Sequence, residues 1–278
     1  MNSWTGAIAE AAASLAAAGV PSPRVDAELL AAHVSGLRRG ELIASGAPTE
    51  AELASFAALV ARRGRREPLQ HLTGAAPFRY AEIAVGPGVF VPRPETELLV
   101  DWALGRLPRG GLVVDACSGS GAIAHAIATE RPDSRVWAVE AEPDAFEWMK
   151  SNLQGTGATP VLADAVAEDT LAELDGQVDL VVANPPYVPM DMEVAPEVDF
   201  DPSGAVYADE AGLAVIQPLT LRAARWLRSG GWYGFEHDDT HGKAAPEILR
   251  VSGFVDVDDH RDLAGRSRFA TGRLGLSP

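Results

Sequence analysis

The stretch Leu112–Ala122, which reads LVVDACSGSGA, decides the fold that we expect for this chain. Its first four residues, Leu112–Asp115, have the composition of a short buried strand, and a run of small residues follows at once. Small residues after a strand let a ligand approach the backbone, and the amides at the start of the next helix point into the same space. The stretch therefore predicts a strand, a ligand-binding turn and a helix in succession.

Similar apolar runs recur along the rest of the chain, and helical stretches separate several of them. Strands that alternate with helices predict a doubly wound α/β sheet, whose ligands bind at the carboxyl ends of the strands. We expect a Rossmann-like sheet of seven mostly parallel strands. These strands are expected at Leu112–Asp115, Val136–Glu140, Val161–Ala163, Leu180–Ala183, Trp232–Glu236, Phe254–Val257 and Arg268–Thr271, with a helix at Leu213–Leu227 after the fourth.

The first part of the chain predicts a small bundle of three helices. An alanine-rich helix is expected at Thr5–Ala18, and a second helix starts at Pro23 after the potential N-cap Ser22. A third opens with Thr49–Glu52, which has the spacing of a capping box. The second helix is expected to bury a stripe made of Val25, Leu29 and Ala32. The arginines that end the third helix are interpreted as a solvated basic terminus, and they are Arg62, Arg63, Arg65 and Arg66.

Residues 76–94 are interpreted as a connecting β-hairpin between two domains, a helical one at 1–75 and a cofactor-binding one at 95–278. Extended pieces are expected at Ala81–Val85 and Val89–Val91, followed by a helix at Glu95–Leu104. The hairpin is expected to bury four side chains, those of Phe78, Tyr80, Ile83 and Phe90.

Composition narrows the functional classes. The chain carries 39 acidic and 23 basic residues, a net charge of −16, and a field of that sign repels phosphate backbones. We therefore expect no direct nucleic-acid partner. The single cysteine excludes an intrachain disulfide and fits a reducing compartment. No apolar stretch has the length of a membrane span, and the first residues lack the pattern of a secretory leader. A cytoplasmic protein without a membrane partner is expected.

Acidic residues end the first three expected strands, and they indicate the cofactor. Asp115 suits an amino-acid ammonium group, Glu140 suits two ribose hydroxyls, and Asp164 suits the amino group of adenine. S-adenosylmethionine carries all three groups, so we predict it as the cofactor. The predicted cofactor-binding residues are Asp115, Cys117, Ser118, Gly119, Ser120, Gly121, Glu140, Asp164, Ala165 and Asn184.

A dinucleotide is the competing cofactor for such a turn. Its fingerprint is Gly-x-Gly-x-x-Gly, and here Gly119 and Gly121 are followed by Ala124 at the third position, which is a tolerated variant. The glycines alone therefore do not exclude it. Asp115 argues against it, because a carboxylate at the strand end repels a pyrophosphate.

The fourth expected strand ends in Asn184-Pro185-Pro186-Tyr187, which we predict to be the catalytic motif. An amide nitrogen is a poor nucleophile, so its NH2 must be held in line with the methyl–sulfur bond while acceptors draw on its protons. The side-chain oxygen of Asn184 and the carbonyl of Pro185 are suitable acceptors. Pro186 stiffens the turn together with Pro185, and Tyr187 offers an aromatic face to a planar amide and to a nearby cation.

An Asn-Pro-Pro-Tyr motif behind such a fold resembles the class I methyltransferases that modify planar nitrogens, on adenine or on glutamine. Four further motifs are similar to the bacterial peptide chain release factor glutamine methyltransferases, and the resemblance covers nearly the whole chain. They are FVPRPETELLV at Phe90–Val100, PLQHLTG at Pro68–Gly74, RVDAELL at Arg24–Leu30 and RDLAGR at Arg261–Arg266. The resemblance implies methylation of the glutamine in the Gly-Gly-Gln loop of a class 1 release factor, with the N-terminal bundle docking that protein.

The chain departs from this family in two places. Cys117 replaces a glycine of the usual Asp-Leu-Gly-Thr-Gly-Ser-Gly, and Asp238–His241 stands where the family tends to show Gly-x-x-Gln after Glu-His. His237 and His241 have the spacing of metal ligands, but we interpret them as surface polar residues and expect no metal. Arg93 either touches substrate or pairs with Glu95 or Glu97.

Other functions stay open at this point. A glutamine methyltransferase with another protein substrate shares every motif quoted above. A nucleic-acid adenine methyltransferase shares the Asn184–Tyr187 motif but needs a basic recognition surface. A non-catalytic binding protein remains the third alternative, with Cys117 weakening the cofactor site.

Overall fold

The computed structural model describes residues 3–189, 192 and 194–275, without the side chains of residues 210 and 211. The chain forms two compact units, each with a hydrophobic core of its own. The helical unit comprises Met1–Ala75 and Ala195–Phe200, and the α/β unit comprises Ala76–Val194 and Asp201–Pro278. A short segment from the second half of the sequence therefore belongs to the N-terminal unit.

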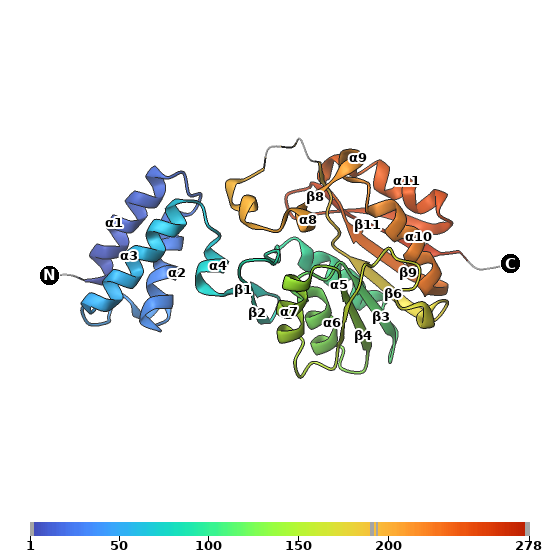
Figure 1. Cartoon of the computed structure of the whole chain (residues 1–278), viewed down its shortest axis with the longest axis horizontal. Helices are drawn as coiled ribbons and strands as arrows, with labels where there is room; N and C mark the ends of the chain where they lie inside the picture. The colour runs from blue at the N-terminus through green and yellow to red at the C-terminus, as the bar shows by residue number, and fades with distance from the viewer. Residues whose placement is uncertain (1–2, 190–191, 193, 276–278) are drawn as a thin grey trace. The chain divides into compact units, whose positions relative to one another are not determined.

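The helical unit is a small bundle (Figure 1). Thr49 and Glu52 cap the third helix reciprocally, because the Thr49 hydroxyl accepts from the Glu52 amide and the Glu52 carboxylate accepts from the Thr49 amide at 2.7 Å. The predicted capping box is thus confirmed. The elements of this unit are α1 Trp4–Ala17, α2 Pro23–Ser35, η1 Arg39–Glu41, α3 Glu50–Gly64, α4 Leu69–Thr73 and η3 Pro196–Phe200.

Helix α2 presents a different face to the core from the predicted one. Val25 is 40% exposed, and Leu29 and Ala32 are only half-buried. Asp26 turns inward instead, because its carboxylate meets an arginine of α3. The prediction from hydrophobicity alone was wrong here, since it took no account of a charged residue that is buried with a partner. The residues that α2 buries are Asp26, Ala27, Leu30 and Ala31.

The arginines at the end of α3 do not form a solvated terminus, which corrects the interpretation from the sequence. Arg63 is buried, and its guanidinium donates to Asp26 Oδ2 at 2.7 Å and to Glu197 Oε1 at 2.8 Å. Arg66 donates two hydrogen bonds to the same Glu197 carboxylate, at 2.8 and 2.7 Å. Burial would raise the pKa of Glu197, but the hydrogen bonds from Arg66 and Arg63 outweigh it and lower the pKa to about 2. An ion-pair network therefore fixes the segment Ala195–Phe200 to the helical unit.

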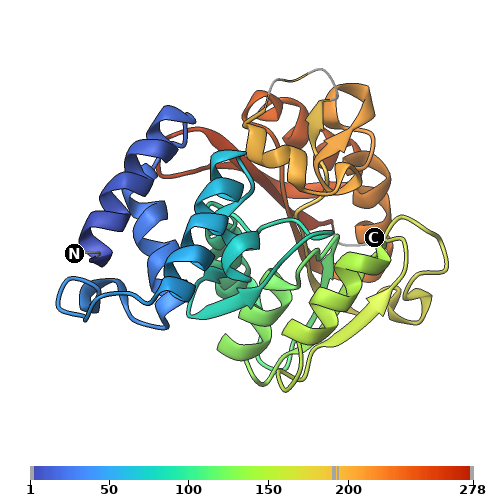
Figure 2. The same ribbon diagram turned by 60° about the vertical axis from the view of Figure 1, so that its left-hand side comes forward.

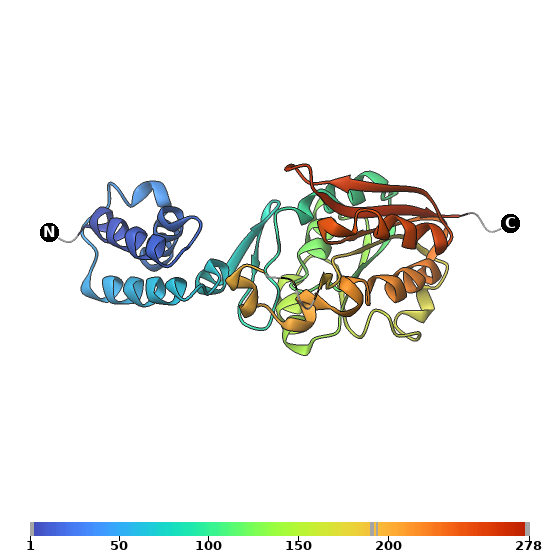
Figure 3. The same ribbon diagram turned by 90° about the horizontal axis from the view of Figure 1, so that it is seen from above.

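The α/β unit contains the predicted sheet of seven strands, in the order β10-β11-β9-β6-β3-β4-β5. Figures 2 and 3 show the ribbon from two further sides, with the C-terminal strands in red. The five strands from β9 to β5 run parallel, and the C-terminal hairpin joins β9 antiparallel. The strands are β3 Leu112–Ala116, β4 Arg135–Glu140, β5 Thr159–Leu162, β6 Val178–Ala183, β9 Leu227–Glu236, β10 Phe254–Arg261 and β11 Ser267–Leu274.

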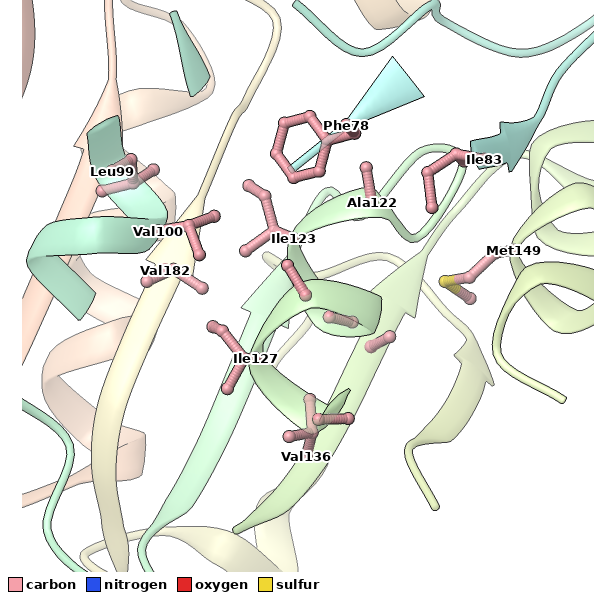
Figure 4. Packing of buried hydrophobic residues seen from close by; sticks show 14 of the residues in the cluster. Phe78, Ile83, Leu99, Val100, Ala122, Ile123, Ile127, Val136, Met149 and Val182 are labelled. Atoms are coloured by element: carbon pink, nitrogen blue, oxygen red, sulfur yellow. The ribbon is translucent and has the colours of Figure 1, made fainter. Parts of the chain in front are cut away.

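Helices cover both faces of this sheet. One core lies between the sheet and α5, α6 and α7, and Figure 4 shows Leu99 of α5, Ile123 and Ile127 of α6 and Val182 of β6 within it. The other core lies under α10 and α11, with Trp226 fully buried. The helix expected at Leu213–Leu227 corresponds to α10, and the short helix α9 precedes it. The helices are α5 Thr96–Arg106, α6 Ala122–Glu130, α7 Pro143–Asn152, α8 Ser203–Val206, α9 Asp209–Gly212, α10 Ile216–Trp226 and α11 Ala244–Val251.

The remaining short elements are the paired strands β1 Ala75–Phe78 and β2 Ala81–Ala84, the paired strands β7 Val188–Pro189 and β8 Tyr207–Ala208, and the 3-10 turns η2 Ala172–Leu174 and η4 Asp239–His241. Phe78 and Ile83 are buried as expected, but Tyr80 is 88% exposed because it lies in the two-residue turn. Val89–Val91 forms no strand, although Val89 and Val91 are buried. Within the described residues, no helix is long and apolar enough to cross a membrane.

Candidate active site

The predicted site residues lie at one edge of the α/β unit. Parallel strands β6, β3, β4 and β5 are neighbours, so their carboxyl ends share that edge. Asp115 is the penultimate residue of β3 and Glu140 the last of β4. Asn184 directly follows the end of β6, and Asp164 is the second residue after the end of β5. The sheet order therefore brings together residues from four separate stretches of the sequence.

Asp115 is fully buried and only half satisfied. Its Oδ2 accepts from the Ser118 hydroxyl at 2.5 Å and from the Ala124 amide at 3.0 Å, whereas Oδ1 has no hydrogen-bond partner among the described residues. Burial raises the pKa of Asp115 to about 7, against the lowering effect of those two hydrogen bonds. Burying a carboxylate oxygen without a donor costs free energy of folding, so this oxygen is suited to accept from a ligand donor or to pair with a cation.

The turn after β3 is held open toward this edge. The Ser118 amide donates to the Val139 carbonyl at 2.9 Å, and the Gly119 amide donates to Glu140 Oε2 at 2.7 Å. A Cβ placed on Gly119 would meet nothing within 4 Å, so free space lies above it. Gly121 is needed for another reason, because a Cβ there would approach Met149 Cγ to 3.0 Å. The turn thus combines an accessible backbone with close helix packing.

Cys117 occupies this turn in a left-handed conformation, with φ of 57°. A side chain at such an angle costs about 1–2 kcal/mol, and a glycine would avoid this strain. Burial and the neighbouring carboxylates of Glu140, Asp115 and Asp164 raise the pKa of its thiol. The thiol therefore stays protonated, which argues against a reactive nucleophile and for a small residue that lines the turn.

Glu140 and Asp164 complete the acidic edge. Glu140 is buried, which raises the pKa of its carboxyl, and it accepts from the amides of Gly119 at 2.7 Å and Glu142 at 2.9 Å. Each of its oxygens accepts one backbone amide and keeps a further lone pair for a hydroxyl donor. Asp164 is exposed and accepts from the Val166 amide at 3.0 Å, beside the buried Ala165.

This arrangement fits S-adenosylmethionine. The unsatisfied Asp115 Oδ1 matches an ammonium donor, and the free acceptor capacity of Glu140 matches ribose hydroxyls. The open space above Gly119 allows a ligand to approach the backbone. Individual contacts of these residues with the cofactor remain predictions.

The Asn-Pro-Pro-Tyr turn begins where β6 ends. Asn184 is half-buried, and its Nδ2 donates to the Thr96 hydroxyl of α5 at 3.5 Å, which directs Oδ1 away from Thr96. Pro185 is buried, and Tyr187 packs against the core under α10 and α11. Burial raises the pKa of the Tyr187 hydroxyl, so it stays protonated. The turn thus presents a side-chain oxygen next to the acidic edge.

Sequence reasoning missed a buried acid in this region. Glu236 ends β9 and is fully buried, and within the part of the chain that the structure describes its Oε1 has no hydrogen-bond partner. Burial raises the pKa of Glu236 to about 7, while a hydrogen bond from Thr96 and the charge of Arg268 act in the opposite direction. An acid at the end of a fifth strand repeats the pattern of Asp115 and Glu140, and that repetition was the signal available in the sequence.

Arg93 takes neither of the partners expected from the sequence. Its Nη2 pairs with Asp201 Oδ2 at 2.9 Å, and its guanidinium lies 4.8 Å from the centre of the Phe90 ring. Asp201 is buried and also accepts from the Val91 amide at 3.4 Å. The pairing was not predictable, because Asp201 lies 108 residues further along the chain.

His237 and His241 are buried, which corrects their interpretation as surface residues. His237 hydrogen-bonds through Nδ1 to the Asp238 carbonyl at 2.8 Å and through Nε2 to Asp259 Oδ1 at 3.0 Å. The antiparallel strands β10 and β11 bring Asp259 to this place, and the sequence does not show that pairing. Within the described part of the chain, no group of three or more His, Cys, Asp or Glu side chains could hold a metal ion.

Comparison with known proteins defines the class. Residues 83–197 match the family model of the methyltransferase small domain, and residues 6–74 match that of the PrmC N-terminal domain. The chain is an S-adenosylmethionine-dependent methyltransferase.

Curated relatives define the family. The chain is 52% identical to the release factor glutamine methyltransferase of Mycolicibacterium smegmatis, with 95% of each chain covered. It is 49% identical to that of Streptomyces coelicolor, over 99% of this chain and 100% of the relative, and 37% identical to that of Salmonella typhimurium, over 91% and 93%. It belongs to the release factor glutamine methyltransferase family.

Solved structures agree on the fold. The catalytic domain of hMettl16, in complex with the MAT2A 3′UTR hairpin 6, superposes with a TM-score of 0.53 and 16% identity, and the match covers 70% of this chain and 76% of that one. At this identity the similarity concerns the fold alone.

Proposed function

We propose that this enzyme methylates the side-chain amide nitrogen of the glutamine in the Gly-Gly-Gln loop of a class 1 peptide chain release factor, in the cytoplasm. The family supports the choice of substrate. The observation that carries the proposal is the position of Asn184, which follows Ala183 of β6, the residue paired with Ala116 of β3. The acceptor for the target amide therefore stands beside the strand whose Asp115 is suited to the cofactor.

The chemistry requires orientation more than proton transfer. When bound, S-adenosylmethionine supplies an electrophilic methyl group on a sulfonium sulfur. Asn184 Oδ1 and the Pro185 carbonyl accept hydrogen bonds from the two N–H groups of the glutamine amide, and these bonds raise the electron density on its nitrogen. Pro186 restricts the turn, and the ring of Tyr187 stacks on the planar amide. The methylated nitrogen then releases one proton to water.

The helical unit is the proposed docking module for the protein substrate. It has its own core, and the carboxylates suited to the cofactor lie in the other unit. The expected recognition is therefore divided, with the fold of the release factor recognised by the helical unit and its glutamine by the Asn184–Tyr187 turn.

Transfer of a labelled methyl group tests the substrate. The purified chain is incubated with labelled S-adenosylmethionine and one of three acceptors: a class 1 release factor, the same factor with its Gly-Gly-Gln glutamine changed to alanine, or single-stranded DNA. Label is expected in the intact factor only. Equal labelling of the alanine variant would refute the glutamine assignment, and labelling of DNA would favour an adenine methyltransferase.

Removal of residues 1–75 tests the docking module. The truncated chain is expected to bind S-adenosylmethionine with nearly unchanged affinity and to retain activity on a short Gly-Gly-Gln peptide. Its methylation of the intact release factor is expected to collapse. Normal methylation of the intact factor by a truncated chain that binds the cofactor would exclude the docking role.

A further inference from the structure

The side-chain amide of Asn184 has two ends, and only one of them can accept a hydrogen bond from the target NH2 group. Oδ1 accepts hydrogen bonds, whereas the NH2 group only donates and would repel the NH2 of a glutamine. Catalysis therefore depends on which end faces the substrate. In the structure, Nδ2 donates to Thr96 Oγ1 at 3.5 Å. The hydrogen bond with Thr96 therefore decides which end of the Asn184 amide faces the substrate.

Thr96 is the first residue of α5, and its side chain is buried. A threonine hydroxyl has one proton to donate and two lone pairs. The Thr96 hydroxyl is hydrogen-bonded to the carboxylate of Glu236 as well as to Asn184. Above its raised pKa of about 7, the Glu236 carboxylate is ionised and only accepts, so the Thr96 proton is then committed to Glu236. Thr96 can then only accept from Asn184, which must present its NH2 to Thr96 and its Oδ1 to the other side.

Topology places these three residues together. Ala183 of β6 pairs with Phe235 of β9, so Asn184 and Glu236 are the next residues on two neighbouring parallel strands. Helix α5 packs on both of these strands and brings Thr96 to their carboxyl ends. Thr96 and Asn184 are 88 residues apart in the sequence, so the contact between them exists only in the folded chain.

Burial raises the pKa of Glu236, and the charged groups around its carboxyl act on that pKa in both directions. Arg268 precedes Phe269, the β11 residue that pairs with Glu236, and its positive charge stabilises the ionised carboxylate. Glu95 acts in the opposite direction, and the hydroxyl of Tyr187 is hydrogen-bonded to Arg268. The positive charge of Arg268 thus acts on both Glu236 and Tyr187.

We propose that Thr96 and Glu236 are positioning residues, which fix the amide of Asn184 with Oδ1 toward the target nitrogen through the relay Asn184 N–H to Thr96 hydroxyl to Glu236 carboxylate. The inference rests on the proposed function, since it assigns the orientation of the group that binds the glutamine amide. It predicts that Thr96 affects turnover through Asn184.

Two substitutions of Thr96 test the relay. Thr96→Val keeps the shape but removes the hydroxyl, so Asn184 can turn either way, and kcat on the release factor is expected to fall about tenfold. KM for S-adenosylmethionine is expected to stay unchanged. Thr96→Ser keeps the hydroxyl and is expected to restore most of the turnover. Equal activity of the valine variant and the parent would overturn the inference, and so would equal losses in the valine and serine variants.

A double-mutant comparison separates positioning from general packing. If Thr96 acts through Asn184, then Thr96→Val has no further effect on kcat in an Asn184→Ala background. Glu236→Gln, which removes the charge and lets the side chain donate to Thr96, is expected to lower kcat several-fold in the parent and not in the Asn184→Ala background. A tenfold additional loss from Thr96→Val in that background would show a structural role and refute the relay.

The outcome for the parent chain keeps the two proposals apart. Failure of the parent to methylate the release factor would refute the proposed function. An active parent whose kcat is insensitive to Thr96→Val would refute only the relay. Melting temperatures of all variants are compared with that of the parent, and the serine and glutamine variants keep the test decisive where the valine variant unfolds.

Discussion

In the helical unit the buried guanidinium of Arg63 contacts the carboxylates of Asp26 and Glu197. In the α/β unit the buried carboxyls of Asp115 and Glu236 each keep an oxygen that no described residue hydrogen-bonds. The first arrangement lowers the pKa of Glu197 to about 2, because two arginines outweigh its burial. The second raises the pKa of Asp115 and Glu236 to about 7, because burial outweighs their hydrogen bonds.

This difference separates a structural use of charge from a functional one. A buried ion pair with complete partners holds elements together, and its loss destabilises the fold. A buried carboxyl with a free oxygen weakens the fold but is preorganised for a ligand or a reacting group, and perturbed carboxyls of this kind gather at functional sites. We therefore expect substitutions at Arg63 to change the stability of the fold. Substitutions of acids at the carboxyl ends of the parallel strands are expected to change function.

The largest effect is expected for Arg63→Met. The substitution leaves Asp26 buried without its cation, which costs about 3–5 kcal/mol of the free energy of unfolding. Denaturant titration followed by circular dichroism measures the change in the transition that includes the helical unit. Arg24→Met is the matched control, because Arg24 is 52% exposed in its pair with Glu28 and such pairs contribute at most about 1 kcal/mol. Equal losses in both variants would contradict a structural role for the buried network.

The next effect concerns Asn184 in the α/β unit. Asn184→Ala removes one of two oriented acceptors, and the loss of one such contact costs on the order of 2.7–4 kcal/mol of transition-state stabilisation. Turnover on the release factor is expected to fall roughly a hundredfold or more, with an unchanged circular dichroism spectrum. Near-native turnover would identify the Asn-Pro-Pro-Tyr turn as purely structural.

Asn184→Asp sharpens the same test. The variant keeps an acceptor oxygen and adds a negative charge close to the sulfonium. That charge stabilises the ground-state cation more than the charge-dispersed transition state, so turnover is expected to fall even where cofactor binding tightens. Single-turnover rates and calorimetry, measured on the same preparation, distinguish the two effects. A variant with parental turnover would show that orientation by any acceptor oxygen suffices.

A smaller effect is expected for Glu140→Ala. Loss of a charge-assisted hydrogen bond weakens the binding of S-adenosylmethionine at least tenfold, which corresponds to roughly 1.4 kcal/mol. Isothermal titration calorimetry measures the affinity. Glu147→Ala serves as control, because the Glu147 side chain on α7 is 69% exposed. Unchanged affinity in Glu140→Ala would remove this residue from the cofactor site.

The smallest effect is a pH dependence of cofactor binding. The pKa of Asp115 is raised to about 7, so below that pH its carboxyl is neutral and must lose a proton before it accepts an ammonium group. Affinity for S-adenosylmethionine is therefore expected to fall roughly eightfold from pH 7.5 to pH 6.0. The raised pKa of Glu140 acts in the same direction. Asp115→Asn is expected to bind more weakly and with a flatter profile, and an unaltered slope in this variant would contradict the role of Asp115.

The sequence predicted the α/β unit well, because its signals are local. A buried parallel strand is a short apolar run whatever lies beside it, and Leu112–Ala122 combines such a run with a turn and a helix start. The predicted capping box at Thr49 is equally local, since its four residues satisfy one another. The acids at the strand ends were found for the same reason, as each directly ends or follows an apolar run.

Only the tertiary structure decided which polar residues are buried and with what partners. Asp26 faces the core because Arg63 meets it from another helix, and His237 is buried because β10 brings Asp259 to it. Thr96 meets Asn184 across 88 residues of sequence. A polar side chain enters a protein interior only where a partner is supplied. That partner comes from long-range packing, so local sequence determined the elements and the fold determined their polar contacts.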